Sequence, residues 1–467
     1  MELQAPHHSE HTSMVQPEQA GQYASIRWKE RLGYGIGDFS TNLIWVAITT
    51  YLTFFYTDIA HLSAGVIGTV LLATRLLDGV VDIGIGVLVD RTRSKHGKAR
   101  PWLKWMSLPF GLSVMLLFTA PDLGATGSIF YAAITYFIVT VIYSSINIPY
   151  AALNSLITQE PYQRSMLNIT RGVLSMCGGV LISVMALPLV NTLGGGKMGW
   201  SLTFVIIGLL SPLLLMITYK TTRERVKPVV VQKQIPLRIA LRSLIRNKYW
   251  LLVVAFTTLV FLSSGISSAL NIYYAQYILH DSGLVGVLAL AGLLPIVIGM
   301  LVSAPLIKRL GKRNTVLLGM CISLAGALLV LIQPSSLEIV LLSTVLKTLG
   351  TAPAVATGAA MLADTVEYGE WKTGARIEGL IYSGSGLSSK IGTGLGGACV
   401  GWALAWGGYV GGVQFQSASA LQAITTLFLY VPIVLAILQI VLMTMYQLDK
   451  RYPVIIAELK AMTNPQS

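Results

Sequence analysis

Long apolar runs constrain this chain more than any other feature of its sequence. Each run holds roughly 20 or more residues, the length of an α-helix that crosses a lipid bilayer. Because a backbone inside lipid must satisfy its own hydrogen bonds, the runs predict helices. Charged residues make up only 11% of the chain, against about 25% in soluble domains. We expect an all-α membrane protein with about twelve spanning helices, at 34–57, 63–89, 102–120, 127–153, 166–193, 199–219, 250–279, 284–307, 315–333, 338–362, 379–405 and 420–446.

The net charge of +13 does not indicate a nucleic-acid partner, because the positive residues follow a membrane pattern. They gather in the connections after the second, fourth, sixth, eighth and tenth runs, and the opposite connections are nearly free of them. Cytoplasmic loops of membrane proteins carry this excess of lysine and arginine. The pattern predicts that both termini lie in the cytoplasm.

The longest connection divides the chain into two halves of six runs. It is strongly basic, and its 237–244 stretch has the pattern of an amphipathic helix that lies on the inner membrane surface. Basic turns at Gly97-Lys98 and at Gly311-Lys312, after the second and eighth runs, indicate an internal repeat. We expect a disordered cytoplasmic tail 1–30, a six-helix bundle 31–220, a cytoplasmic linker 221–249, a second six-helix bundle 250–447 and a cytoplasmic tail 448–467.

Cysteine and histidine usage gives no sign of a disulfide framework or a metal site. Cys177, Cys321 and Cys399 lie inside apolar runs without a ligand-like spacing, and we expect them to be small buried hydrophobic residues. The N-terminal tail lacks the positive start and apolar core of a cleavable signal peptide. The sequence predicts no metal and no other cofactor.

Three ionisable residues, Arg75, Asp78 and Asp82, lie inside the second apolar run. Their spacing of three and four places them on one face of a helix. A carboxylate at this depth costs roughly 2.5–3.5 kcal/mol on insertion scales, so such residues usually face a cavity and serve a function. The stripe predicts a site for a coupling ion or a proton. The alternative is a structural Arg75–Asp78 pair that locks two helices together.

Polar residues at helical spacing on several runs predict a water-filled cavity. Lipid-facing helices do not align hydroxyls and amides along one face, so these faces line a cavity or seal against another polar helix. A tryptophan on the first of these faces suits either stacking on a sugar ring or plain packing. The candidate residues are Asp38, Asn42 and Trp45 in the first run, Ser144 and Asn147 in the fourth, and Asn271 in the seventh.

Basic residues also occur at bilayer depth. Arg171 lies well inside the fifth run, either as a cavity residue or as an arginine that snorkels to the interface. Lys390 is too deep in the eleventh run to snorkel cheaply, and its simplest partner is the Asp78/Asp82 pair across the interface between the halves. Lys347 in the tenth run has no evident acidic partner. It suggests a substrate with a negative group, and the alternative is a lysine that bonds to backbone or packs toward the outer leaflet.

Acidic residues recur at every third position at the end of the tenth run, as Asp364, Glu367 and Glu370. The set lacks histidine, so we interpret it as a gate rather than as a metal site. Its expected partners are arginines of the equivalent loop in the first half, in ion pairs that close the inner side in one state and break in the other. The charged residues of that loop are Asp90, Arg91, Arg93 and Arg100.

Five blocks of sequence lie in order over both halves of the chain. They are Gly33-Tyr34-Gly35-Ile36-Gly37-Asp38, Phe55-Tyr56-Thr57-Asp58, the segment from Arg75-Leu76-Leu77-Asp78 to Pro101-Trp102, Asn147-Ile148-Pro149-Tyr150, and Ala363-Asp364-Thr365-Val366-Glu367-Tyr368-Gly369-Glu370-Trp371-Lys372. These blocks resemble the family of glycoside–pentoside–hexuronide:cation symporters, over almost the whole chain apart from the N-terminal tail. The resemblance implies a major facilitator fold in a bacterial cytoplasmic (inner) membrane, and transport of a sugar or sugar derivative together with a cation by alternating access.

The resemblance also implies roles for individual residues. The family's paired acids, which bind the coupling cation, match Asp78 and Asp82. The lysine that occupies this site when no cation is bound matches Lys390, and an arginine near the sugar matches Arg171.

This chain departs from the melibiose-permease-like members at the acidic sugar ligands, where it has Asn42 and Asn147. The asparagines resemble the pentoside and glucuronide branches of the family. They favour the proton over sodium as the coupling ion.

Other functional classes receive less support from the sequence. A membrane enzyme needs a catalytic cluster at a membrane face, and we find none. A non-transporting sensor, an uncoupled facilitator and a transporter or exporter of an anionic derivative, such as a sulfonated sugar, are the alternatives. Since one chain contains both halves, we expect a monomer whose partners are a small sugar, H⁺ or Na⁺ as coupling cation, and lipid.

Overall fold

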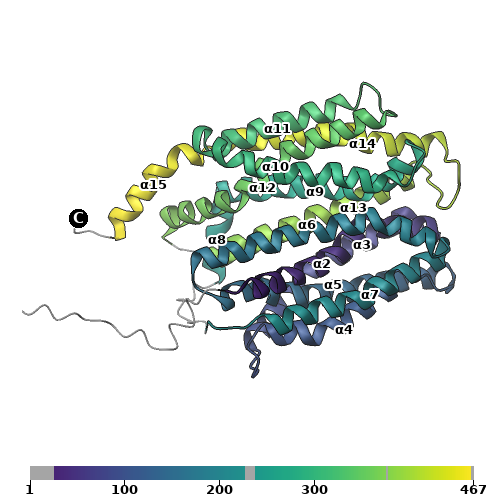
Figure 1. Ribbon diagram of the computed structural model, residues 1–467. Helices are drawn as coiled ribbons and strands as arrows, with labels where there is room; N and C mark the ends of the chain where they lie inside the picture. Colours follow the sequence, from purple (N-terminus) through teal and green to yellow (C-terminus); the bar gives the residue numbers. More distant parts are fainter. Residues whose placement is uncertain (1–25, 227–236, 375–376, 464–467) are drawn as a thin grey trace, which may run out of the picture.

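The computed structural model describes residues 26–226, 237–374 and 377–463. These ranges form helices joined by short connections, and they contain no strand (Figure 1). Residues 1–25 of the predicted disordered tail, 1–30, lie outside the described residues. The last three residues of that predicted tail belong to the first helix, which begins at Trp28.

The first half of the chain forms one bundle of long helices. Its first helix continues without a break into a short π-helical segment, η1, so that the two form one continuous helix. The elements are α2 (Trp28–Phe54), η1 (Phe55–Ile59), α3 (Ala64–Arg91), α4 (Arg100–Leu117), α5 (Gly124–Ile157), α6 (Pro161–Thr192) and α7 (Gly196–Thr221).

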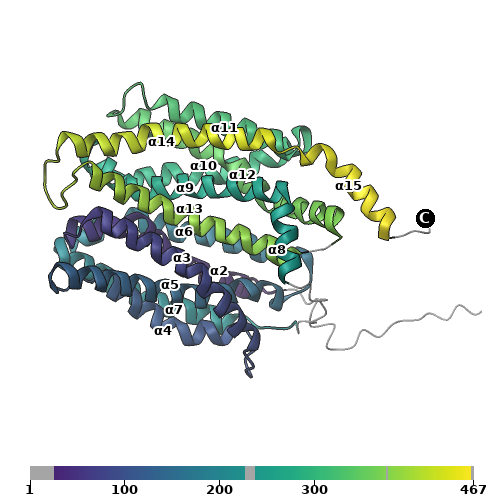
Figure 2. The same cartoon turned by 180° about the vertical axis from the view of Figure 1, so that it is seen from behind.

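The second half forms a similar bundle that lies alongside the first (Figures 1 and 2). A short helix in the linker, α8 (Leu237–Arg246), includes the 237–244 stretch that we expected to be helical. After the bundle a further helix, α15 (Leu448–Thr463), occupies most of the segment that we described only as a tail. The bundle elements are α9 (Lys248–Tyr277), α10 (Leu284–Leu310), α11 (Lys312–Leu329), α12 (Leu337–Thr373), α13 (Glu378–Trp406) and α14 (Ala418–Met445).

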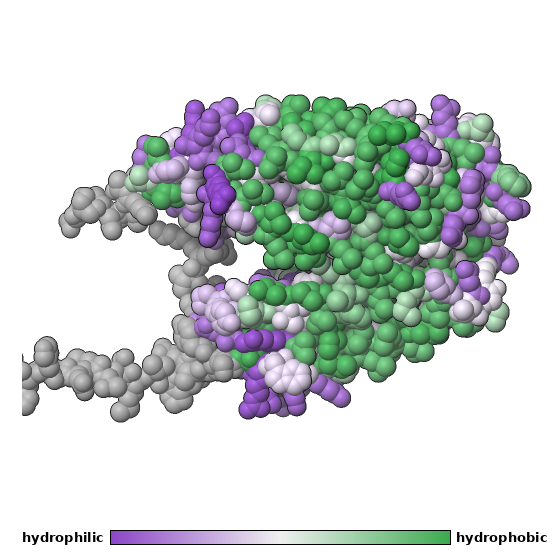
Figure 3. Space-filling model, turned by 45° about the horizontal axis from the view of Figure 1, so that its top comes forward, coloured by the Kyte–Doolittle hydropathy of each residue, from purple (hydrophilic) through white to green (hydrophobic). Residues whose placement is uncertain are grey.

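The helices have the composition of membrane spans. Within the described ranges, eight spans are long and apolar enough to cross a bilayer, one of them α14 together with part of α15. The helices α2, α4, α11 and α13 pack against them. Figure 3 shows an apolar surface over the middle of the molecule with polar residues at both ends. The expected all-α arrangement of twelve long helices in two bundles is confirmed. The expectation for the cysteines is wrong at Cys177 and Cys321, which are exposed on the outside of their helices, because apolar positions of a membrane protein also face lipid.

The two bundles repeat one structural detail at equivalent loops. Glu224, just after α7, accepts backbone N–H groups of Lys98, Ala99 and Arg100 at 2.8, 2.9 and 2.9 Å, and so caps the start of α4. Asp449, just after α14, accepts the backbone N–H of Arg313 at 2.8 Å near the start of α11. The internal repeat that we inferred from the basic turns is therefore visible in the structure.

Small residues bring the two bundles together along α3 and α13. A Cβ on Gly401 of α13 would lie within 3.0 Å of the backbone of Gly68 on α3, and one on Gly394 would lie 2.8 Å from the Cβ of Arg75. Such close approach is typical of helix crossings inside membranes. It places the side chains of α3 directly against α13, and these chains carry the ionisable residues described below.

The two ends of the molecule differ. We call the end at which η1 lies the η1 end and the end at which α8 and α15 lie the α8 end. One apolar core contains Phe54 and Phe55 together with Tyr273 and Tyr277, and so joins both bundles at the η1 end. At the α8 end the second bundle has an apolar core of its own, and Figure 3 shows a hollow between the bundles there.

Candidate substrate and ion site

A cluster of ion pairs joins the two bundles near the middle of the membrane-spanning region. The ammonium of Lys390, on α13, lies 2.8 Å from Oδ2 of Asp78 on α3. The same ammonium forms a second, short contact with Oδ2 of Asp82. The three residues that sequence reasoning placed together across the interface are therefore in direct contact.

Asp78 is the buried member of this cluster, with 2% of its surface exposed. Its Oδ1 accepts a hydrogen bond from the hydroxyl of Ser144 on α5 at 2.9 Å, and its Oδ2 lies 3.8 Å from the guanidinium of Arg75. The predicted structural pair, Arg75–Asp78, thus exists, but Lys390 is the closer cation. Asp82 is more open, and its Oδ1 has no hydrogen-bond partner among the residues described.

Arg75 links the ion pairs to an aromatic stack. Its guanidinium lies 4.0 Å from the ring centroid of Trp45 and 5.5 Å from that of Tyr136. Trp45 also stacks on Tyr143, with ring centroids 4.7 Å apart and an interplanar angle of 25°. Because Arg75 and Tyr143 both lie against the indole, this conformation favours packing, the second of our two expectations for Trp45, over a free sugar-stacking platform.

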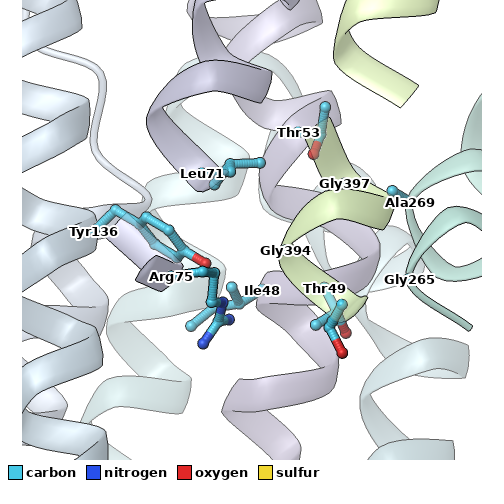
Figure 4. Close-up of a pocket in the computed structure, with 11 residues that line it drawn as sticks. Ile48, Thr49, Thr53, Leu71, Arg75, Tyr136, Gly265, Ala269, Gly394 and Gly397 are labelled. Carbon is cyan, nitrogen blue, oxygen red and sulfur yellow. The ribbon is translucent and has the colours of Figure 1, made fainter. Parts of the chain in front are cut away.

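A small cavity lies next to Arg75 on the side of the η1 end (Figure 4). Its volume is about 30 Å³, enough for roughly two water molecules. Thr49 and Thr53 of α2 and Tyr136 of α5 line one side, and Gly394 of α13 lines the other. The cavity lies at the interface between the bundles, where polar groups of both meet.

A second ion pair lies closer to the α8 end. The guanidinium of Arg171 on α6 meets the carboxylate of Asp38 on α2 at 3.1 Å and 3.4 Å, and it lies 5.0 Å from the ring centroid of Tyr150. Arg171 therefore points into the bundle and does not snorkel. The amide of Asn42 donates to the backbone carbonyl of Asp38 at 3.2 Å.

Two other candidate residues keep free polar groups. Asn147 on α5 and Asn271 on α9 are half-buried, and within the described ranges neither side chain has a hydrogen-bond partner. An amide that is partly buried without a partner is available to a ligand. The two residues stand on opposite bundles.

Lys347 differs from the other cations at this depth. Its ammonium lies 4.7 Å from the ring centroid of Phe428 on α14, and Phe428 stacks on Tyr274 of α9 at 3.7 Å. No carboxylate of the described part of the chain forms an ion pair with it. The expectation that Lys347 lacks an acidic partner agrees with this geometry.

The charged residues at the α8 end do not form the pairs that we expected in this conformation. Asp364 forms an ion pair with Lys312, and Glu367 accepts a hydrogen bond from Tyr452, both within the second half. Asp90 pairs with Lys98 at 2.7 Å. Arg100 donates to the backbone carbonyl of Tyr219 at 2.7 Å, and the side chains of Arg91 and Arg93 are exposed. Glu370 also takes part in a polar or electrostatic interaction. Since the bundles are apart at this end, the acids have found partners in their own half.

Sequence reasoning missed the contacts that close the η1 end. The buried carboxylate of Asp58 accepts hydrogen bonds from the hydroxyls of Tyr409 at 2.7 Å and Tyr277 at 3.1 Å, and from the backbone of Gly412 at 3.2 Å. Next to it, the hydroxyls of Thr57 and Tyr273 lie 2.8 Å apart. Asp58 and Thr57 belong to a block that we had noted, but nothing in the sequence linked them to tyrosines more than 200 positions away.

In the described ranges no three histidine, cysteine, aspartate or glutamate residues gather as a metal site. The polar groups that the described site offers are the ion pairs of Asp78, Asp82 and Asp38 and the amides of Asn147 and Asn271.

Comparison with known proteins agrees with this geometry. Residues 33–450 match the MFS/sugar transport protein family. An isoprimeverose transporter of Lactiplantibacillus pentosus is 35% identical, with 98% of this chain and 97% of the relative covered. The putative glycoside/cation symporter YagG of Escherichia coli (strain K12) is 34% identical, with 93% of this chain and 95% of the relative covered.

A solved structure supports the fold. A mutant of the nucleoside transporter NupG superposes with a TM-score of 0.64 at 13% identity, over 88% of this chain and 99% of that chain. With the family match and the arrangement of the helices, the conclusion is that this chain belongs to the MFS/sugar transport protein family, as a multi-pass membrane protein.

Proposed function

We propose that the protein is a cation-coupled symporter of a glycoside, a pentoside, a hexuronide or a related sugar derivative. The relatives named above, an isoprimeverose transporter and a putative glycoside/cation symporter, support this proposal. So does the observation that carries it: Lys390 of one bundle neutralises Asp78 and Asp82 of the other. Neither the relatives nor the site favours an enzyme.

The mechanism that we propose is competition for the paired acids. Two carboxylates and two cations, Arg75 and Lys390, balance in the present conformation. A cation or proton that binds Asp82, the more open acid, weakens the ion pairs between Lys390 and the acids of α3. Because Lys390 belongs to the other bundle, loading the acids changes the contact between the bundles, and this link couples the ion to the movement that alternating access requires.

The proton suits this site better than sodium. Hard metal cations take several oxygen ligands, roughly six or more for Ca²⁺ and Mg²⁺. The ammonium of Lys390 already contacts Asp78 and Asp82, and the other oxygen of Asp78 is taken by the hydroxyl of Ser144. A proton needs one carboxylate oxygen. We therefore propose H⁺ as the coupling ion, with Na⁺ as the alternative.

The two ends have different roles in this proposal. The α8 end lies on the cytoplasmic side of a bacterial inner membrane, in agreement with the basic connections at that end, and we place both termini on that side. The conformation described is then closed to the outside by Asp58 and its tyrosine partners, and hollow toward the cytoplasm. The sugar binds between the bundles, near Asn147, Arg171 and Asn271. One chain suffices, since it supplies both sides of the site.

The test is a transport screen in proteoliposomes, over glycosides, pentosides and hexuronides, with an imposed proton or sodium gradient. We expect one of these sugars to accumulate under a proton gradient, and Asp78→Asn and Asp82→Asn to abolish accumulation with less effect on binding. Asp122→Asn, at an exposed pair with Lys197, is the matched control and should transport normally. Accumulation that persists in both variants would contradict the coupling assignment, and accumulation driven only by sodium would contradict the proton.

A further inference from the structure

We infer that Lys347 forms an anion-binding subsite, and that the transported sugar carries a monoanionic carboxylate or sulfonate group. This inference rests on the proposed function, because it assigns Lys347 a part in recognising the sugar that the proposed symporter carries. Lys347 lies ten residues after Leu337, the first residue of α12. At ~1.5 Å rise per residue its Cα is about 15 Å from that end of the helix, well inside the membrane-spanning region.

The first argument is the missing counter-ion. Each of the other cations described above inside the bundles has an acid: Arg75 and Lys390 have Asp78, and Arg171 has Asp38. Lys347 meets only the ring of Phe428 among the described residues. A cation–π contact contributes roughly 0.5–2 kcal/mol. A lysine at the centre of a spanning helix costs about 2.5–3.5 kcal/mol, so the contact alone leaves the charge under-compensated.

The second argument is the direction in which Lys347 points. Neighbouring positions of α12 pack elsewhere, since Leu346 lies against Gly326 of α11 and Thr348 donates to the carbonyl of Ala291 on α10. Lys347 instead lies toward α9 and α14, where Phe428 stacks on Tyr274. The ammonium thus faces the interior of the second bundle, where it lies over the ring of Phe428.

The third argument is the free amide on the same side. Asn271 lies three residues before Tyr274, the α9 residue on which Phe428 stacks, so it occupies the next turn of that helix. Its amide offers donors to a ligand oxygen and has no partner within the described chain. A cation with a nearby free amide donor is suited to one charged group bearing two or three oxygens.

The number of positive charges limits the class of anion. Phosphate sites usually combine several donors, such as an arginine fork, a helix N-terminus or more than one cation, because the group carries close to two charges. Lys347 is a single compact charge in a largely aromatic setting. It matches one negative charge, as a sugar carboxylate or a sugar sulfonate provides, and it does not match a sugar phosphate.

The test compares matched probes that differ only in charge. Phenyl β-D-glucuronide and phenyl β-D-glucoside form one pair, and methyl glucosides with and without a sulfonate at C6 form the other. Uptake of each is measured in proteoliposomes under a proton gradient for the wild type, Lys347→Gln and Lys347→Arg. Lys197→Gln removes a cation at an exposed pair and serves as the control for net charge.

The wild type should take up the anionic member of at least one pair with an affinity at least tenfold above that of its neutral partner. Lys347→Gln should remove that preference, because a hydrogen bond to a charged group corresponds to about a ten- to hundredfold effect. Lys347→Arg should keep most of it, and Lys197→Gln all of it. The pair that shows the preference distinguishes a carboxylate from a sulfonate.

Equal uptake of the charged and neutral probes, unchanged in Lys347→Gln, would overturn the subsite and leave the symporter proposal intact. Uptake of neither pair under any gradient would contradict the subsite, while the wider sugar screen described above decides separately whether the protein is a symporter. If Lys347→Gln is poorly folded, Lys347→Arg decides the question in comparison with Lys347→Met, because the methionine keeps the packing on Phe428 while it removes the charge.

Discussion

The two bundles share a scaffold but differ in how they balance their charges. In each, an acid after the last helix caps an internal helix, as Glu224 does for α4 and Asp449 for α11. In the first bundle the buried cations are neutralised from within, Arg75 by Asp78 and Arg171 by Asp38. In the second, Lys390 is neutralised by the first bundle and Lys347 by no described acid.

This difference shows where the protein is able to respond to a ligand. The first bundle pairs each of these cations with an acid of its own, but its Asp82 finds a cation only in Lys390 of the second bundle. A bundle that offers unpaired cations depends on what it meets, whether that is the acids of the other bundle or a bound anion. A change of protonation at Asp78 or Asp82 therefore acts on the interface, and it does so through Lys390.

The largest expected effect comes from removing the cation that joins the bundles. Lys390→Ala leaves the buried Asp78 with the Ser144 hydroxyl and with Arg75 at 3.8 Å, and without its closest cation. We expect a loss of roughly 3 kcal/mol in unfolding free energy, at the low end for breaking a buried ion pair. Thermal unfolding in detergent measures it, and Lys197→Ala at the exposed pair should show no change.

A double variant separates charge from packing in this experiment. Adding Asp78→Asn to Lys390→Ala removes the uncompensated charge, so it should recover part of the lost stability. If the two single losses simply add, the pair does not couple the bundles and the comparison above is wrong.

The next largest effect concerns the closure of the η1 end. Asp58→Asn removes the charge that three donors of the second half share. Hydrogen bonds to a charged group contribute about 1.5–3 kcal/mol, so the variant should shift the population toward the state open at this end by tenfold or more.

Spin labels at Asp122 and Phe415, exposed loop residues of different halves at the η1 end, report the separation as a distance distribution. The native cysteines are replaced for this measurement. A distribution that stays at the wild-type distance would show that Asp58 does not hold this end closed.

The two capping acids provide a smaller and matched comparison. Glu224 accepts three backbone N–H groups and Asp449 accepts one. Glu224→Gln should therefore lower the unfolding free energy by about 1–2 kcal/mol and Asp449→Asn by about 0.5 kcal/mol. Equal losses of unfolding free energy in the two variants would mean that both caps contribute equally. The two halves would then be more alike at this loop than their numbers of hydrogen bonds indicate.

The smallest effect is expected at Trp45. Trp45→Phe keeps an aromatic ring beside Arg75 and Tyr143, and a weaker cation–π contact should reduce stability by only about 0.5 kcal/mol. Sugar affinity should fall by less than about threefold if the ring only packs. A loss of affinity of about tenfold or more, measured by binding, would instead support the stacking role.

Much of this arrangement was predictable because charge inside a membrane is rare and must be compensated. Apolar runs located the helices, and the isolated charges Asp78, Asp82 and Lys390 had few possible partners, so their contact across the interface could be expected. The same reasoning applied to Arg171, whose acid proved to be Asp38.

The rest depended on information that local sequence does not carry. Tyrosines occur throughout membrane helices, so nothing marked Tyr277 and Tyr409 as partners of Asp58. The acids Asp364 and Glu367 were expected to reach arginines of the other half, but which charges meet depends on the conformation. In the conformation described, Lys312 and Tyr452 are nearer.

The most direct test of the coupling site compares accumulation with exchange in one variant. Wild type and Asp78→Asn are reconstituted, and uptake of the same sugar is measured under a proton gradient and, separately, as equilibrium exchange without one. We predict that Asp78→Asn exchanges sugar at a rate within a few fold of the wild type but accumulates none. Accumulation at the wild-type level by Asp78→Asn would contradict the assignment of Asp78, Asp82 and Lys390 as the coupling site.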